Sequence, residues 1–249
     1  MNFYYCLLAA WSLLAIIILL VLLFTKLIAP YGRHNHLKSK MTIANHWGWF
    51  WMELPALVLF PLITWIGPST KSSFLYLLLG LWVLHYFNRS ILFPFRLISQ
   101  GKQMPLLILI SALLFNATNG FFNGYYLGFL GESQSLDFSL NQILGLLLFF
   151  GGFFINLQAD QILIKLRKKG KGYQIPQKGL YPFISCPNYL GEIMEWTGFA
   201  LLAWNPAAAS FALWTFCNLF PRALTHHKWY QEKFPTYPAS RKAIIPFLI

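Results

Sequence analysis

The sequence has few charged residues, few cysteines and none of the short motifs that mark the common catalytic sites. Only 10% of its 249 residues are charged, against roughly a quarter in an ordinary globular protein, and this excludes a soluble domain. The three cysteines lack metal-ligand spacing. Because no HExxH, GxSxG, GxGxxG or P-loop pattern occurs, the sequence does not predict a metal hydrolase, a serine hydrolase or a Rossmann-type nucleotide site.

What the sequence does have is long apolar runs. Hydrophobic residues make up 57% of it and aromatic residues 18%, and windows of about 20 apolar residues indicate transmembrane helices. An Asn205-Pro206 turn signal separates the last two of the predicted spans. We therefore predict an all-α, polytopic integral membrane protein, with residues 1–249 forming a single seven-helix domain. The predicted spans are residues 4–24, 48–67, 73–93, 104–128, 139–165, 189–204 and 206–226.

The net charge of +12 is distributed unevenly between the two ends of these spans. The basic residues cluster after the first, third, fifth and seventh spans, and Lys71 is the one exception. Cytoplasmic loops carry an excess of Lys and Arg, so we predict an N-terminus outside the cell and a cytoplasmic C-terminus. The charge is explained by orientation, and we expect no nucleic-acid partner.

Polar residues inside the spans gather towards the same, cytoplasmic end as the basic residues. With this orientation, five of the spans place polar side chains in their cytoplasmic halves, and several of these residues are spaced by four, on one helix face. An ionisable residue at a membrane helix centre costs about 2.5–3.5 kcal/mol and usually faces a bundle interior or a wet cavity. We therefore predict a polar cavity, open to the cytoplasm, for an anionic partner. The residues are Glu53, His85, Tyr86, Arg89, Asn156, Asp160, Arg167, Asn188, Glu192, Glu195, Arg222, His226 and Tyr230.

Purely structural roles would explain part of this pattern. Asp160–Arg167 and Glu192–Arg222 could be ion pairs that lock helices together. The basic segment 165–178 suits phosphate groups, but a solvated cytoplasmic loop would have the same composition. In the fourth span, Asn116, Asn119 and Asn123 are predicted to form interhelical hydrogen bonds, with Gly120 and Gly124 allowing close packing; we assign them no chemistry.

Several stretches resemble one known family. They are HWGWFWMELPA, GLWVLHYFNRS, GFFINLQADQILIKLRK, YQIPQKGLYPFISCPNYLGEIMEW and PRALTHHKWYQEKFPTYPASRKAIIPFLI. Together they closely resemble the steroid 5α-reductases, from about residue 46 to residue 249, and the last hundred residues are the most specific. The loop composition suggests a bacterial-type member.

The resemblance implies seven transmembrane helices and NADPH-dependent reduction of the C4–C5 double bond of a Δ4-3-oxosteroid, without flavin or metal. It also implies catalytic roles for Glu53 and Tyr86. The expected partners are a steroid or another hydrophobic enone and membrane lipid, with the protein a monomer in a bacterial inner membrane. The cofactor residues it implies are Asn156, Asp160, Arg167, Tyr173, Asn188, Glu192, Arg222, His226 and Tyr230, with Arg89 and Arg241 near the cofactor.

The chemistry agrees with these roles. Hydride delivered to C5 of an enone moves charge onto the C3 oxygen, and a donor aimed at that oxygen stabilises the enolate. Tyr86 can donate, while Glu53 can orient Tyr86 or supply a proton. Glu195, one turn beyond Glu192, is expected only to brace its helix, and segment 165–178 could form a lid. Met52 and Phe93 replace a glutamine and a tyrosine usual in animal members, which leaves the particular steroid open.

Other functions remain open from the sequence. A related membrane reductase could act on another lipid enone, an enoyl thioester or a polyprenal. An isoprenylcysteine-type methyltransferase would share the C-terminal Asn/Glu helix pattern, but the ELP and HYF blocks argue against it. A transporter would explain the intramembrane acids, but the sequence lacks the inverted repeats of many transporters.

Overall fold

The computed structural model describes residues 2–25, 41–97, 101–132, 134–168 and 172–249. The chain divides into two compact units. Unit 1 comprises Met1–Ile28 and Leu140–Ile249, and unit 2 comprises Ala29–Ser139. Each unit has its own helix packing, and the single seven-helix domain stays a prediction.

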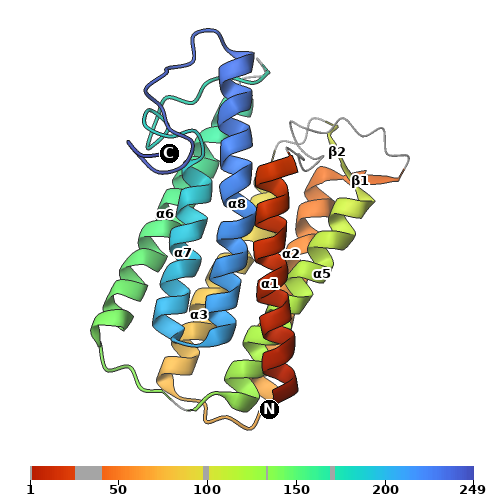
Figure 1. The fold of residues 1–249 in the computed structure, drawn as a ribbon. Coiled ribbons are helices and arrows are strands. Elements are labelled where there is room, and N and C mark those ends of the chain that lie inside the picture. The colour runs from red at the N-terminus through yellow and green to blue at the C-terminus, as the bar shows by residue number, and fades with distance from the viewer. Residues whose placement is uncertain (1, 26–40, 98–100, 133, 169–171) are drawn as a thin grey trace. The chain divides into compact units, whose positions relative to one another are not determined.

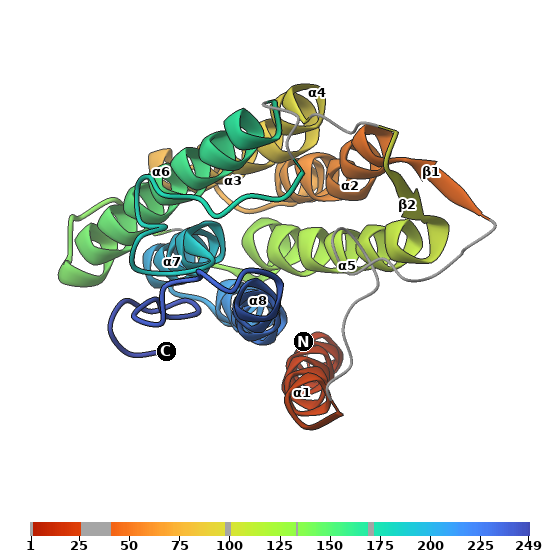
Figure 2. The ribbon, with the colours of Figure 1, turned by 90° about the horizontal axis from the view of Figure 1, so that it is seen from above.

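Unit 1 contains four long helices. They are α1 (Asn2–Thr25), α6 (Leu140–Lys168), α7 (Pro187–Ala203) and α8 (Pro206–Lys233), and Figures 1 and 2 show α6, α7 and α8 side by side. The turn predicted at Asn205-Pro206 is confirmed: Trp204, the residue after α7, has the left-handed conformation, and the Asn205 side chain accepts from the backbone N of Ala208 at 2.9 Å. The residues after α8 fold back over the start of α7 (Figure 1).

Two glycines on each helix allow α6 and α7 to touch through their backbones. Gly145 and Gly152 lie on α6, and Gly191 and Gly198 lie on α7. A Cβ added at Gly191 would lie 2.6 Å from both the Asn156 nitrogen and the Gly152 oxygen. Small residues at such a crossing are typical of membrane helix pairs, and here they bring the polar residues of both helices within hydrogen-bonding reach.

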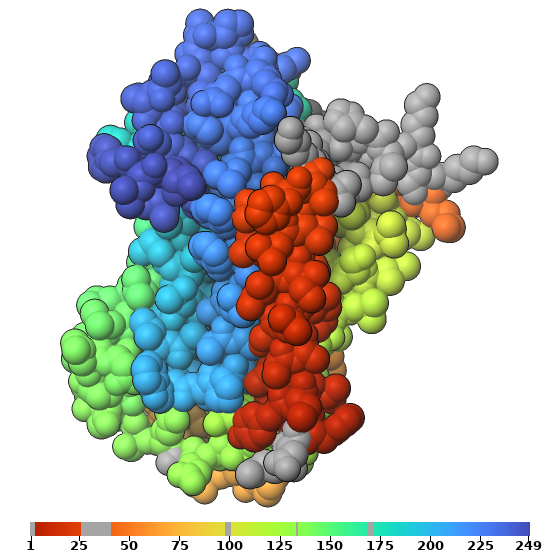
Figure 3. All heavy atoms as spheres, viewed as in Figure 1, coloured from red at the N-terminus to blue at the C-terminus, as the bar shows by residue number. Residues whose placement is uncertain are grey.

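Helix α1 packs along α8. The Ser12 and Ser210 hydroxyl oxygens are 2.8 Å apart, and the rings of Trp11 and Trp214 are 4.5 Å apart. Most large apolar side chains on the rest of α1, such as Leu13, Ile17 and Phe24, are exposed. The helix is the long red column in Figure 3. Such a surface suits contact with lipid.

Unit 2 is built around the pair α2 (Asn45–Ile66) and α5 (Leu106–Tyr125). Each follows a short strand, and these strands, β1 (Thr42–Ala44) and β2 (Gln103–Pro105), pair antiparallel. Three glycines on α5 and its π-helical continuation η3 (Tyr126–Leu130) allow contact with α2: a Cβ at Gly124 would lie 2.9 Å from the Phe60 oxygen, and one at Gly128 would lie 2.8 Å from the Ile63 oxygen. The predicted packing role of Gly120 and Gly124 is confirmed; the strands were not predicted.

The third helical segment of unit 2 is longer than predicted. It runs as α3 (Ser73–Phe87), a π-helical turn η2 (Asn88–Leu92) and α4 (Phe93–Arg96), whereas the apolar run ends at residue 93. Lys71 precedes it, and its ammonium donates to the carbonyls of Thr64 and Gly67, both at 2.8 Å. Because a cation satisfies the last carbonyls of a helix, Lys71 serves as the cap of α2, which explains its departure from the charge bias.

All seven predicted apolar segments are helical in the part of the chain that the structure describes. Five are long and apolar enough to cross a membrane: Phe3–Thr25, Asn45–Ile66, Ser73–Arg96, Leu106–Leu130 and Leu140–Lys168. The protein is therefore a multi-pass helical membrane protein. Helix α7 has only 17 residues, and α8 is more polar, so the crossing of these two helices and the orientation of the N-terminus stay predictions.

Candidate functional site

The polar residues of α6 and α7 meet in unit 1. The Asn156 amide donates to the backbone oxygen of Asn188 at 3.0 Å and to Oε2 of Glu192 at 3.4 Å. In return, the Asn188 amide donates to Oδ1 of Asp160 at 3.3 Å. Asn156 and Asp160 are buried, while Asn188 and Glu192 are half-buried. The sequence-predicted residues of these two helices thus form one hydrogen-bonded cluster, with α7 contributing its partly accessible side.

Helix α8 adds a second group of predicted residues to unit 1. The ring nitrogen Nε2 of His226 is 2.9 Å from the hydroxyl of Tyr189 on α7, and Arg222, one turn earlier, is half-buried. Tyr230 is buried and stacked on Phe234 and Tyr237. The Tyr230 ring therefore packs in the protein interior, in addition to the predicted role of this residue at the site.

The remaining predicted residues of unit 1 lie at its basic end. Arg167 is half-buried in the last turn of α6, between Lys165 and Lys168. Tyr173 packs its ring edge-on against Trp229 of α8, with centroids 5.1 Å apart. Of the segment 165–178 that could form a lid, residues 169–171 lie outside the described residues.

Arg241 is buried and contacts two neighbouring segments of the chain. Its guanidinium donates to the Pro176 oxygen at 3.0 Å and to the Gln177 side-chain oxygen at 2.7 Å, and it lies 5.2 Å from the centre of the Tyr237 ring. The residue is 2% exposed. These contacts join the segment before α7 to the segment after α8, and the role of Arg241 at the cofactor stays a prediction.

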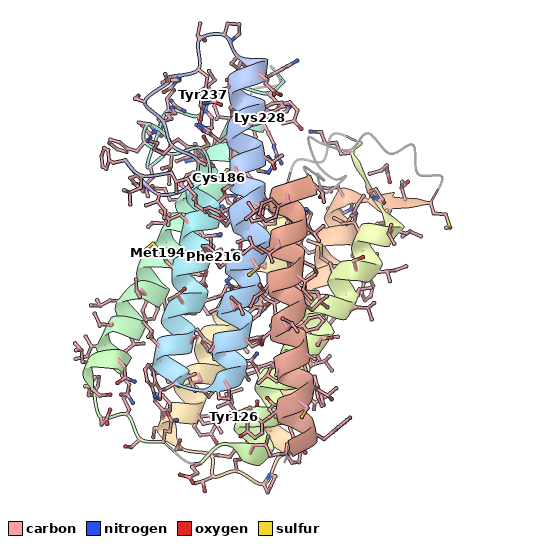
Figure 4. The ribbon with its side chains drawn as sticks, viewed as in Figure 1. Tyr126, Cys186, Met194, Phe216, Lys228 and Tyr237 are labelled. Carbon is pink, nitrogen blue, oxygen red and sulfur yellow. The ribbon has the colours of Figure 1, made fainter. Side chains whose placement is uncertain are left out.

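The sequence reasoning missed a hydrogen-bonded group next to the contacts of Arg241. The Ser185 hydroxyl is 2.6 Å from both Nδ1 of His227 and the hydroxyl of Tyr237, and it also donates to the Lys242 carbonyl at 3.2 Å. Figure 4 shows Tyr237 and Cys186, the neighbour of Ser185, at this end of unit 1. His227 lies beyond the predicted span 206–226; burial, and secondarily the charge of Lys242, lower its pKa below the ordinary value.

In unit 2, the predicted catalytic pair lies on the antiparallel helices α2 and α3. The Trp82 indole donates to the Ala56 carbonyl at 2.9 Å, and the Ser90 hydroxyl donates to the Phe50 carbonyl at 3.2 Å. Midway between these two cross-links, Glu53 and Tyr86 lie at the same level of the helix pair. Glu53 is half-buried and Tyr86 is buried.

Each member of the pair is supported by neighbours. The Tyr86 ring lies 5.0 Å from the ring of Trp82, which stacks on Phe60 at 4.2 Å. Glu53 accepts at Oε2 from the side-chain amide of Asn116 on α5, at 3.1 Å.

The interhelical hydrogen bond predicted for Asn116 is confirmed, but the sequence reasoning missed that its partner is a predicted catalytic residue. The same prediction is wrong for Asn123, whose amide donates to the Asn119 carbonyl of its own helix at 3.0 Å.

Arg89 is held between two aromatic rings of unit 2. Its guanidinium carbon lies 5.1 Å from the centre of the Trp49 ring and 5.0 Å from that of Phe93, within the range of cation–π attraction. The phenylalanine at position 93 therefore covers a buried arginine.

The predicted site residues are thus distributed over both units. Glu53, Tyr86 and Arg89 belong to unit 2, and the other predicted residues belong to unit 1. Among the described residues, no group of three or more His, Cys, Asp or Glu is arranged to hold a metal ion. The protein is thus a multi-pass membrane protein with an amide–carboxylate cluster in unit 1, while in unit 2 Glu53 and Tyr86 lie at the same level of neighbouring helices.

Comparison with known proteins gives the family. The family model of 3-oxo-5-alpha-steroid 4-dehydrogenases matches residues 102–249. A steroid 5-alpha-reductase of Solanum lycopersicum is 39% identical over 225 residues, covering 88% of each chain. The 3-oxo-5-alpha-steroid 4-dehydrogenase 1 of Bos taurus is 41% identical over 235 residues, covering 89% of this chain and 88% of the relative, and that of Homo sapiens is 40% identical over 224 residues, covering 88% and 85%. The chain belongs to the 3-oxo-5-alpha-steroid 4-dehydrogenase family, and its relatives' names support an oxidoreductase.

Proposed function

We propose that this protein reduces the C4–C5 double bond of 3-oxo-Δ4-steroids at the expense of NADPH. The observation that carries the proposal is the identity of about 40%, over nearly nine-tenths of the chain, with relatives named for this reaction. The polar clusters of the two units support it, because each has the chemical groups that one part of the reaction needs.

Unit 1 holds the cofactor in this proposal. Amide and carboxylate groups at Asn156, Asn188 and Glu192 suit the carboxamide and ribose hydroxyls of a nucleotide, since they offer both donors and acceptors. Arg167, Arg222 and the neighbouring lysines suit its phosphates, and Arg can bind a phosphate through two parallel hydrogen bonds. This donor set fits NADPH, which supplies the hydride to C5 when it is bound.

Unit 2 supplies the groups that act on the steroid ketone. The Tyr86 hydroxyl donates to the C3 oxygen and stabilises the negative charge that develops there. Glu53, at the same level on the neighbouring helix, orients Tyr86 or replaces its proton. A proton then reaches C4 from water. The ring packing of Tyr86 against Trp82 keeps the donor in place during the reaction.

The membrane location fits an apolar substrate. A steroid partitions into lipid, and the helices of both units are apolar enough to reach it there. The charge bias supports an N-terminus outside and a cofactor site facing the cytoplasm. The proposal includes a bacterial inner membrane as the location and favours a monomer.

The test is NADPH oxidation by the purified protein with testosterone or progesterone. Tyr86→Phe keeps the ring but removes the donor, and loss of one oxyanion donor costs roughly 10²–10³ in kcat. Tyr76→Phe is the matched control, because Tyr76 is an exposed residue on the same helix. Glu53→Gln should keep a measurable rate if Glu53 only orients Tyr86, and should lose it if a proton must move. Near-normal turnover by Tyr86→Phe would contradict the mechanism, and oxidation of NADPH only with non-steroid enones would contradict the substrate.

A further inference from the structure

The side-chain amide of Asn116 joins α5 to the predicted catalytic glutamate. Its nitrogen donates to the backbone oxygen of Met52 at 2.6 Å and to Oε2 of Glu53 at 3.1 Å. Asn116 is 5% exposed, so water does not compete for these bonds. Both bonds lie within unit 2.

The helix contact explains why this amide reaches its partners. Asn116, Gly120, Gly124 and Gly128 follow one another at intervals of four, so they lie along one face of α5 and its continuation. A Cβ at Gly120 would lie 3.5 Å from the backbone nitrogen of Phe60 on α2. On the face where the other positions are glycines, position 116 therefore places a polar side chain directly against α2.

The Met52 carbonyl settles which end of the amide points at Glu53. A carbonyl oxygen can only accept, so the group 2.6 Å from it must be the NH₂ group of Asn116. The same NH₂ group then donates its second hydrogen to Oε2 of Glu53. A protonated carboxyl group accepts best at its carbonyl oxygen, so this bond favours Oε1 as the oxygen that carries the proton whenever Glu53 is protonated.

We propose that Asn116 is a positioning residue that fixes the orientation of the Glu53 carboxyl group and the oxygen that carries its proton. This inference rests on the proposed function, in which Glu53 supports Tyr86. The anchor is a helix backbone carbonyl, which cannot rotate away, so the amide holds Oε2 at a fixed place relative to α2. Asn123 on the same helix shows the contrast: it is 2% exposed, and its amide donates to Asn119 of its own helix at 3.0 Å.

The first test compares Asn116→Leu with Asn123→Leu in the turnover assay. Leucine keeps the approximate volume and removes the amide, and losing a hydrogen bond to a carboxyl group lowers kcat roughly tenfold or more. We expect that loss in Asn116→Leu, with an unchanged Kd for NADPH, and nearly normal kcat in Asn123→Leu. An Asn116→Leu enzyme with kcat within about twofold of normal would overturn the proposal, as would equal losses in both variants.

The second variant, Asn116→Asp, separates positioning from packing. Aspartate has the shape of asparagine but can donate to Glu53 only when it is protonated. We expect the kcat of Asn116→Asp, relative to that of the unchanged protein, to rise as the pH is lowered, whereas Asn116→Leu should show no such recovery. A pH-independent ratio for Asn116→Asp would contradict the donor role.

An infrared measurement keeps this inference distinct from the proposed function. The carboxyl band of Glu53 is identified by its loss in Glu53→Gln, and it is sensitive to hydrogen bonding at the carboxyl oxygens. We expect the band to shift in Asn116→Leu and to stay in place in Asn123→Leu, whether or not steroid is turned over. Absence of turnover in the unchanged protein would reject the proposed function alone, while an unshifted band in Asn116→Leu would reject the positioning role.

Discussion

At the scale of single residues, amide side chains join neighbouring helices in both units. Asn156 and Asn188 cross-link α6 and α7, and Asn116 cross-links α5 and α2. Interhelical hydrogen bonds in membrane proteins contribute only about 0.6 kcal/mol on average and at most roughly 2. Removing one amide should therefore leave the fold intact, which makes these residues suitable for functional tests.

The cluster of Asn188 and Glu192 gives the first prediction at this scale. If these side chains hold NADPH, Asn188→Ala and Glu192→Ala should each weaken its binding at least about tenfold, since each loses hydrogen bonds to the ligand. Isothermal titration with NADPH measures the affinity. Asn141→Ala is the control, because Asn141 donates to the Leu201 oxygen at the other end of the same helix pair. Unchanged NADPH affinity in both Asn188→Ala and Glu192→Ala would show that these side chains only hold α6 and α7 together.

The group around Ser185 gives a prediction about pH. The lowered pKa of His227 means that folding favours the neutral ring. The stabilisation is thus complete above the ordinary value of 6.5 and is lost as the pH falls through the lowered pKa. The Gln231 NH₂ group, 2.9 Å from Nε2, can only donate, so in the neutral ring Nε2 accepts and Nδ1 donates to Ser185, beside Tyr237 and Lys242. Protonation would turn Nε2 into a donor that faces the Gln231 NH₂ group.

Hydrogen exchange of residues 236–249 at a series of pH values measures this effect. We expect protection of that segment to fall at acidic pH in the unchanged protein. His227→Asn cannot titrate, so it should show a flat profile over the same range. Equal pH dependence in both proteins would assign the loss of protection to another group.

At the scale of elements, close backbone contact determines which helices pair. Gly152 on α6 faces α7, and a Cβ there would meet the backbone of Gly191 and lie 3.0 Å from the Cα of Glu195. Gly151, the adjacent residue, has only the flexible end of Met194 within reach, at 4.0 Å; Met194 is labelled in Figure 4. The two glycines therefore have opposite roles although they are neighbours in sequence.

Substitution by alanine should separate these roles. Gly152→Ala forces α6 and α7 apart, and overpacking of this kind costs about 1–3 kcal/mol. Gly151→Ala should leave the melting temperature unchanged or slightly higher, because alanine favours a helix. Thermal unfolding of both variants in detergent measures the difference. Equal melting temperatures would show that the helix contact is looser than described.

The helices were largely predictable from the sequence, because an apolar run of about 20 residues has few alternatives in a membrane. The ends of the helices were less predictable. Helix α8 continues to Lys233, seven residues beyond the predicted apolar run, because hydropathy indicates where a helix leaves the lipid and not where its last hydrogen bond lies. The pairing of β1 with β2 joins segments far apart in sequence, and no local pattern indicates it.

The site residues were predictable only as far as helical spacing and family resemblance reach. Spacing placed Asn156 and Asp160 on one face of α6, and the structure joins them to Asn188 and Glu192 across the crossing. Neither the link between Asn116 and Glu53 nor the contact of Ser185 with His227 could be predicted. Both depend on how far one helix is rotated and shifted against another, and side-chain composition does not determine that rotation.

At the scale of the whole molecule, the two units carry different parts of the proposed reaction. Unit 1 contains the amide, carboxylate and basic groups suited to a nucleotide, and unit 2 contains Glu53 and Tyr86 for the steroid ketone. The proposed function is therefore tested most directly by following the hydride itself from one substrate to the other.

The measurement uses NADPH labelled with deuterium at the transferable position of the nicotinamide, together with testosterone and the purified protein. Mass spectrometry and NMR of the product locate the label. The account predicts a saturated 3-oxosteroid with deuterium at C5 and a solvent-derived proton at C4. An unreduced steroid, or a reduced steroid that carries no deuterium at C5, would contradict it.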